Sequence, residues 1–135
     1  MQVLKQFGWI FYVADNAQFD ENKVGKWMYF FNDADYVAHL CEKAVRDGIV
    51  KESKHSNAPK GVACFYLHGD DLEAHKRVIG YFMDNDLIEK TKTGRLHNIS
   101  FKYDRQTRAG EYGDSFHSDI RLEQFVDLNT GEFLQ

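Results

Sequence analysis

Two segments of the sequence carry apolar residues at helical spacing along one side only. The first begins at Asn32, which with Asp35 gives a pattern like a capping box, and it ends before Gly48, a residue suited to a helix C-terminus. The second begins at Asp70 and ends around Asn85. Because a helix with one apolar side must bury it against another element, we expect both helices to cover a sheet. The apolar stripes consist of Tyr36, Val37, Leu40, Cys41, Ala44 and Val45, and of Leu72, His75, Val78, Ile79, Phe82 and Met83.

Segments typical of β-strands surround these helices. Alternating, β-branched and aromatic residues predict strands at 9–13, 24–31, 61–68 and 99–104, and a closing hairpin formed by residues 119–128 and 132–134. The polar stretch 51–60 is expected to be part strand and part loop, and residues 105–114 are expected to be a loop. This order of elements predicts an α+β fold in which a mostly antiparallel sheet carries the two helices on one face. The other face is then free for ligands.

Composition limits the class of protein. The 135 residues suit a single domain, spanning 1–135, and no stretch approaches the ~20 apolar residues that a membrane helix needs. The net charge of −4 argues against extensive coating of nucleic acid, which needs a basic face. Cys41 and Cys64 have apolar neighbours, which favours buried thiols over disulfides. We therefore expect a soluble cytoplasmic domain with no membrane partner.

Cationic side chains on or beside the strands are the strongest candidates for a binding site. Strand alternation puts Lys26 among apolar residues, a costly position unless its ammonium group reaches solvent or a charged partner. Lys102 lies on the strand expected after the second helix, Lys54 in the polar stretch, and Arg105 and Arg108 in the following loop. If these groups converge, they form a basic pocket for a phosphate group. If they do not, each lysine simply reaches water at the margin of the sheet.

Three segments, in their order and spacing, resemble the basophilic leukemia-expressed protein family. They are Gly25-Lys-Trp-Met-Tyr-Phe30, Val62-Ala-Cys-Phe-Tyr66 followed by an acidic helix start, and Phe101-Lys-Tyr-Asp104 continuing to Ala109-Gly-Glu-Tyr112. The family's domain carries the label of a phosphothreonine lyase, and its fold is that of the cap-binding translation initiation factors. The resemblance covers residues 24–112 and implies a curved antiparallel sheet backed by helices.

Matching the family's motifs residue by residue gives the site that the resemblance implies. Lys26 and Lys102 fall on lysines of the family, and Lys54, or less closely Lys51, falls on a third. The sequence departs from the family where a Tyr-Lys-Pro-Asp run loses its proline, and where Gln106 replaces an aromatic residue. Because fold does not fix function, these departures bear on the activity more than on the fold.

Three functions from different classes are compatible with these residues. The first is binding of a phosphorylated or nucleotide-like ligand in a basic pocket on the open face of the sheet. The second is a phosphothreonine-lyase-like enzyme, in which Lys102 removes a proton and His68 protonates the leaving phosphate oxygen. The third is a protein-binding inhibitor or interaction module, for example of mobile-element origin. The ligand contacts expected for the first function are Lys26, Lys54, Lys102, Arg105, Arg108, Trp27 and Tyr66.

Aromatic residues and histidines complete the candidates. Trp9 and Trp27, with the tyrosines, are able to stack a nucleobase, although Trp27 is equally suited to the core on the helix-covered side. The six histidines show no spacing typical of metal ligands. We therefore expect neither a metal site nor a cofactor.

Overall fold

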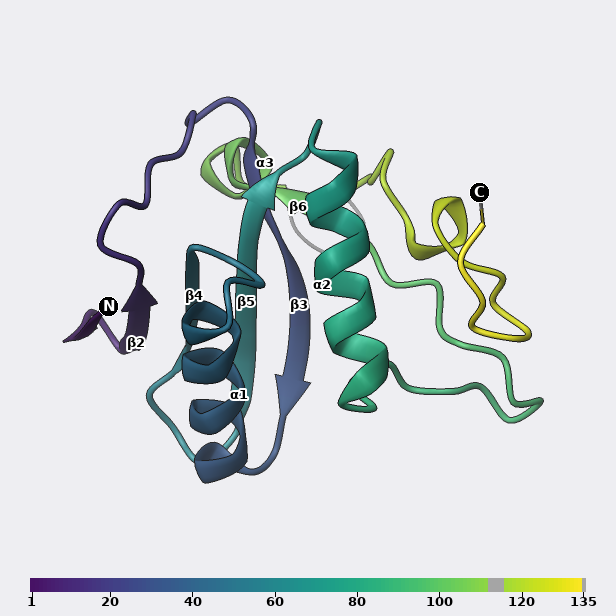
Figure 1. Cartoon of the computed structure of the whole chain (residues 1–135), viewed down its shortest axis with the longest axis horizontal. Helices are drawn as coiled ribbons and strands as arrows, with labels where there is room; N and C mark the ends of the chain where they lie inside the picture. Colours follow the sequence, from purple (N-terminus) through teal and green to yellow (C-terminus); the bar gives the residue numbers. More distant parts are fainter. Residues whose placement is uncertain (112–115, 135) are drawn as a thin grey trace.

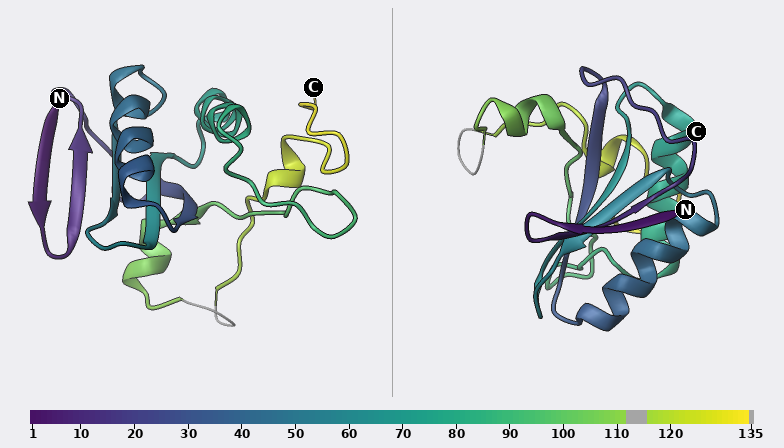
Figure 2. Two further views of the ribbon diagram at one scale, coloured as in Figure 1. Left: turned by 90° about the horizontal axis from the view of Figure 1, so that it is seen from below. Right: turned by 90° about the vertical axis from the view of Figure 1, so that its left-hand side faces the viewer.

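The computed structural model describes residues 1–111 and 116–134. Within these residues, six strands form one antiparallel sheet in the order β1-β2-β4-β5-β3-β6. Helices α1 (Ala34–Arg46) and α2 (Leu72–Asp84) cover one face, and the short helix α3 (Asp104–Arg108) lies on the other (Figure 1, Figure 2). The predicted α+β fold, with two main helices on an antiparallel sheet, is confirmed. The strands are β1 (Gln2–Gln6), β2 (Trp9–Val13), β3 (Val24–Phe31), β4 (Glu52–Ser56), β5 (Gly61–His68) and β6 (Lys102–Tyr103).

Both main helices are capped one residue later than the sequence analysis placed the caps. The Asp33 carboxylate accepts a hydrogen bond from the Tyr36 N–H at 3.1 Å, and the Asp71 carboxylate accepts one from the Ala74 N–H at 3.1 Å. A carboxylate interacts favourably with the positive end of the helix dipole, so Asp33 caps α1 in place of the asparagine before it. The predicted end of α1 is confirmed at Gly48, whose φ of 75° suits a residue without a Cβ atom.

The hydrophobic core lies between the sheet and the two main helices. Trp27 is 0% exposed there, and its ring packs edge-on against Phe101 and Phe125. Its Nε1 donates to His75 Nδ1 at 3.0 Å, and His75 Nε2 bonds to the Gly69 carbonyl at 2.8 Å, which fixes the neutral form with the proton on Nε2. The prediction that Trp27 contacts a ligand is therefore wrong, because strand alternation turns its side chain toward the helices.

The segment after α2 differs most from the sequence analysis. β6 is only two residues long and continues directly into α3, where residues 99–104 were expected to be strand and residues 105–111 loop. The Gln106 side chain accepts from the Tyr103 N–H at 3.1 Å and so caps the start of α3. Ser100, expected in the same strand, instead forms an isolated bridge with Arg121. Residues 112–114 of the expected loop lie outside the described residues.

The expected closing hairpin is reduced to one isolated bridge between Val126 and Phe133. A 3₁₀ helix, η2 (Leu122–Gln124), stands inside what was expected to be its first strand. Leu122 and Val126 are both buried, and the Val126 N–H donates to the Leu122 carbonyl at 3.1 Å. Two buried residues four positions apart suit a helical turn, whereas strand alternation repeats every two residues.

The N-terminal hairpin is a feature that the sequence analysis missed. A two-residue turn of Phe7 (φ 55°) and Gly8 (φ 79°) joins β1 to β2. All residues of β1 are exposed, and the Phe7 side chain is 91% exposed. Tight hairpins of this kind favour Asn or Gly at the first turn position, so a phenylalanine there gives no signal in the sequence.

Two further expectations concern the cysteines and the membrane. Cys41 and Cys64 are buried free thiols, as predicted. Burial raises the pKa of the Cys41 thiol to about 12, which suppresses its reactivity. Among the described residues, none of the helices is both long enough and apolar enough to cross a membrane.

Candidate functional site

The face of the sheet opposite α1 and α2, here called the open face, carries most of the candidate residues. Lys26 of β3 stands directly opposite Tyr66 of β5 on one side and Lys102 of β6 on the other. Lys54 of β4 is opposite Cys64, two residues from Tyr66 on the same side of β5. Four neighbouring strands therefore bring the three lysines and Tyr66 onto one area of the sheet.

Lys26 lies beneath α3, and side chains of α3 accept its hydrogen bonds. The Lys26 side chain is 8% exposed, and its Nζ donates to Asp104 Oδ1 and to Thr107 Oγ1, both at 2.8 Å. The Asp104 carboxylate supplies the negative charge that a buried ammonium group requires. Lys26 is thus committed to holding α3 on the sheet, and a ligand would reach it only by displacing that helix.

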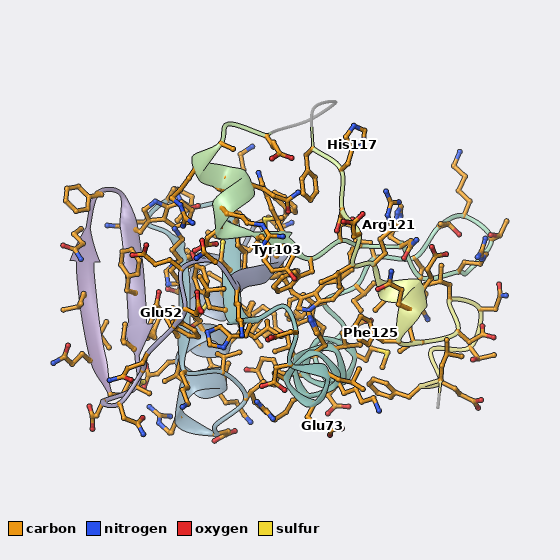
Figure 3. All side chains as sticks on the ribbon, turned by 90° about the horizontal axis from the view of Figure 1, so that it is seen from above. Glu52, Glu73, Tyr103, His117, Arg121 and Phe125 are labelled. Atoms are coloured by element: carbon orange, nitrogen blue, oxygen red, sulfur yellow. The ribbon has the colours of Figure 1, made fainter. Side chains whose placement is uncertain are left out.

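The two arginines of α3 donate hydrogen bonds to backbone carbonyl groups of the protein and do not face an empty pocket. Arg105 Nη1 donates to the Asn22 carbonyl at 2.9 Å, and Arg108 Nη2 donates to the Glu21 carbonyl at 3.0 Å. The guanidinium group of Arg105 also stacks 4.0 Å from the centre of the Tyr103 ring, which is labelled beside α3 in Figure 3. Both arginines are exposed, and in this arrangement they tie α3 to the loop before β3.

Lys54 is the most available cation of the site. Its Nζ lies 3.8 Å from the ring centre of Trp9, 5.5 Å from that of Phe11 and 5.9 Å from that of Tyr66. Among the described residues, no hydrogen bond or ion pair reaches this ammonium group, and no buried polar side-chain atom lacks a partner, so the group contacts water. Burial lowers the pKa of Lys54, and the positive charge of Lys26 contributes.

Lys102 occupies a more enclosed position next to Lys26. It is 6% exposed, and its Nζ lies 5.1 Å from the centre of the Phe116 ring. Burial lowers the pKa of Lys102, and the charge of Lys26 lowers it further, while Glu111 acts in the opposite direction. A lysine with a lowered pKa is a better proton acceptor than an exposed one, which is the property that the lyase hypothesis needs.

His68, the expected acid of the lyase hypothesis, has a structural role. Its Nε2 accepts a hydrogen bond from the Asp20 N–H at 2.9 Å, and its ring packs edge-on against Phe19. A ring nitrogen that accepts a backbone proton cannot donate one to a phosphate oxygen without breaking that bond. His68 therefore anchors the loop before β3 and is poorly arranged for acid catalysis.

Apolar and acidic groups complete the open face. Tyr66 and Cys64 are 7% and 3% exposed and pack with Val24, which gives the site an apolar floor. Burial raises the pKa of Tyr66, so its hydroxyl stays protonated. Glu52, labelled on β4 in Figure 3, is half-buried, and burial raises the pKa of its carboxyl group, with a further contribution from the charge of Asp104.

Sequence reasoning missed two parts of this site. Phe11 contacts Lys54 from the neighbouring strand, and the alternation of β2, which places Trp9 and Phe11 on the same face, was the signal that could have identified it. The Lys26–Asp104 ion pair joins residues 78 positions apart, and no local pattern marks it. No group of side chains able to hold a metal ion occurs among residues 1–111 and 116–134.

Comparisons with protein-family models, with curated proteins and with solved structures found no match. The resemblance to the basophilic leukemia-expressed protein family and to the fold of the cap-binding initiation factors therefore stays a prediction from the sequence.

Proposed function

We propose that the open face binds a small phosphorylated, nucleotide-like ligand, with Lys54 as its principal anion contact. The observation that carries this proposal is the ammonium group of Lys54, which is half-enclosed by aromatic rings but reaches water and has no hydrogen-bond acceptor among the described residues. Such a group has already lost part of its hydration, and its donors remain available to a phosphate oxygen.

The surroundings of Lys54 favour an aromatic ligand that carries a phosphate. Trp9 and Phe11 lie on the same side of β2, where Phe11 is directly opposite Lys54 and Trp9 is opposite Ser56, and both offer ring faces for stacking a base. Lys102 lies on β6, two strands beyond Tyr66, and adds a second cationic side chain to the same face. The charge of Lys26 is balanced by Asp104. In this proposal the base lies toward β2 and the phosphate toward β5.

The lyase-like activity is the second candidate and rests on Lys102 alone. The lowered pKa of Lys102 favours it as a base, but His68 is held by the Asp20 backbone and does not serve as the acid. Binding without catalysis is therefore the function that the geometry supports better.

The proposal is tested by comparing adenosine monophosphate, guanosine monophosphate, inorganic phosphate and unphosphorylated adenosine in calorimetric titrations. We expect Lys54→Met to weaken nucleotide binding by about 10-fold or more, since hydrogen bonds to charged groups contribute ~1.5–3 kcal/mol. Lys43→Met is the matched control, because this lysine lies on α1, across the sheet, and pairs with Asp47. Equal affinities of the Lys54→Met and Lys43→Met proteins would reject Lys54 as the anion contact.

The same proteins distinguish binding from catalysis. A phosphothreonine peptide is incubated with the wild type and with Lys102→Met, and the peptide mass is followed. If the wild type removes phosphoric acid from the peptide and Lys102→Met does not, the protein is a lyase and the proposal of binding without catalysis is rejected. An unchanged peptide together with nucleotide binding is the result that we expect.

A further inference from the structure

The outer edge of β3 is paired along only a small part of its length. β6 pairs with Gly25 and Lys26, and beyond them no described strand lies beside β3 on this side. If β6 continued toward its N-terminus in the same register, Ser100 would face Met28, but the pairing of β6 with β3 ends at Lys102. Ser100 forms an isolated bridge with Arg121. Figure 1 shows the arrowhead end of β3 at the edge of the sheet.

The backbone direction of β3 follows from its other neighbour. The Gly69 N–H donates to the Lys23 carbonyl at 2.8 Å, so alternate residues from Lys23 onward form hydrogen bonds with β5. The N–H and C=O groups of Met28 and Phe30 therefore point to the opposite edge. Among the described residues, no hydrogen bond reaches these four groups. They form the pattern of donors and acceptors that a strand presents to a new neighbour.

A groove of about 380 Å³ lies along this edge. Its lining is mostly apolar, Phe30 is 73% exposed beside it, and Glu89 is the carboxylate that lines it. Tyr29 also lines the groove, and burial raises its pKa, with contributions from Tyr36 and from the carboxylates of Asp33 and Glu89. The groove thus combines an apolar wall with the carboxylate of Glu89 and the imidazole of His97. The lining includes Met28, Phe30, Leu87, Glu89, His97 and Ile99.

We propose that this edge binds an extended segment of a partner protein in which a lysine or arginine alternates with apolar residues. The backbone of an extended peptide has regularly spaced donors and acceptors. These can pair with the N–H and C=O groups of Met28 and Phe30, as in strand addition to a sheet edge. Its apolar side chains fit the groove wall, and its cation complements the carboxylate of Glu89. This site is separate from the lysines of the open face and holds whether or not that face binds a nucleotide.

The probe is an acetylated and amidated hexapeptide of alternating valine and lysine, added to the whole chain and followed by amide hydrogen exchange in NMR spectra. We expect saturation to slow exchange of the Met28 and Phe30 amides at least ~10-fold, because both become hydrogen-bonded donors. A copy of the peptide that is N-methylated at the bonding positions should bind about 10-fold more weakly, since it has lost its own donors. A valine–glutamate peptide should bind more weakly still.

Variants test the charge and the location. Glu89→Gln should weaken binding of the lysine peptide by about 2- to 5-fold, while Glu73→Gln, at an exposed position in the first turn of α2, should leave it unchanged. Lys54→Met should also leave it unchanged. Absence of binding at millimolar peptide, equal binding of the N-methylated copy, or unprotected Met28 and Phe30 amides would each overturn the proposal. Protection of these amides by concentration-dependent dimerisation would assign the edge to a second copy of the chain and would overturn it as well.

Discussion

The ion pair between Lys26 and Asp104 gives a sharp test of how α3 is held on the sheet. The Lys26 side chain is 8% exposed and that of Asp104 is 27% exposed, so the ammonium group is buried while the carboxylate is partly hydrated. Asp104→Asn keeps an oxygen acceptor but removes the compensating charge. Lys26→Met keeps the length of the side chain and removes the buried charge itself.

The two substitutions should differ because their desolvation costs differ. Removing one partner of a fully buried pair costs ~3–5 kcal/mol, whereas an exposed pair contributes ~0–1 kcal/mol. Since Asp104 is partly exposed and Thr107 also accepts from Lys26, we expect Asp104→Asn to cost about 2 kcal/mol. For a chain of this length that corresponds to a fall in Tm of about 8 °C. Lys26→Met should cost less, because methionine suits the apolar neighbours.

The assay is urea unfolding followed by tryptophan fluorescence for the wild type, both single variants and the double variant. The double variant Lys26→Met with Asp104→Asn should be more stable than Asp104→Asn alone, since no unpaired ammonium group remains buried. If the double variant is the least stable of the four proteins, a buried charge is not what makes Asp104 necessary, and the reasoning fails.

Further expectations concern three other places in the fold. Burial lowers the pKa of His75, so stability should rise as the pH rises from the lowered folded-state pKa to about 6.5, the usual unfolded value. A His75→Gln protein whose urea midpoint changes with pH at the same slope as the wild type would contradict this. Phe7→Asn should raise Tm by about 3 °C, because asparagine tolerates the positive φ of the turn; a lower Tm would show that the exposed ring stabilises the hairpin. Gly25→Ala should lower the free energy of unfolding by more than ~2 kcal/mol, since its Cβ would lie 2.5 Å from the Phe101 ring. By contrast, Gly80→Ala in α2 should leave it unchanged or raise it by up to ~1 kcal/mol, and urea unfolding measures both effects.

Local patterns were sufficient for the central part of the fold. In β3 and β5 the alternation of side chains correctly divided the residues between two faces and grouped Lys26 with Val24 and Met28, but it did not decide whether the face of Trp27 was the core. The helical stripes correctly identified most of the buried residues of α1 and α2, although Tyr36 and Leu72 of these stripes are exposed. These elements are long enough for the period of apolar residues to be unambiguous.

The parts of the fold that the sequence did not predict depend on contacts between residues far apart in the chain. Residues 99–104 alternate like a strand, yet the bridge from Ser100 to Arg121 and the cap from Gln106 shorten it to β6. Whether cations converge also depends on pairing, and on the open face Lys54 combines access to water with the absence of a hydrogen-bond acceptor among the described residues. The arginines looked equivalent to the lysines in sequence, but backbone carbonyls of the loop before β3 occupy them.

The contacts of α3 also determine which parts of the fold can form first while the chain is being synthesised. They join Lys26 to Asp104 and Thr107 over 78 and 81 positions, and Arg105 and Arg108 to the loop before β3 over 83 and 87 positions. During synthesis, β1 to β5 and both main helices emerge before any of these partners exists. A nascent chain that ends before Asp104 therefore displays Lys26 to the solvent, and the arrival of α3 converts that exposed cation into an internal anchor.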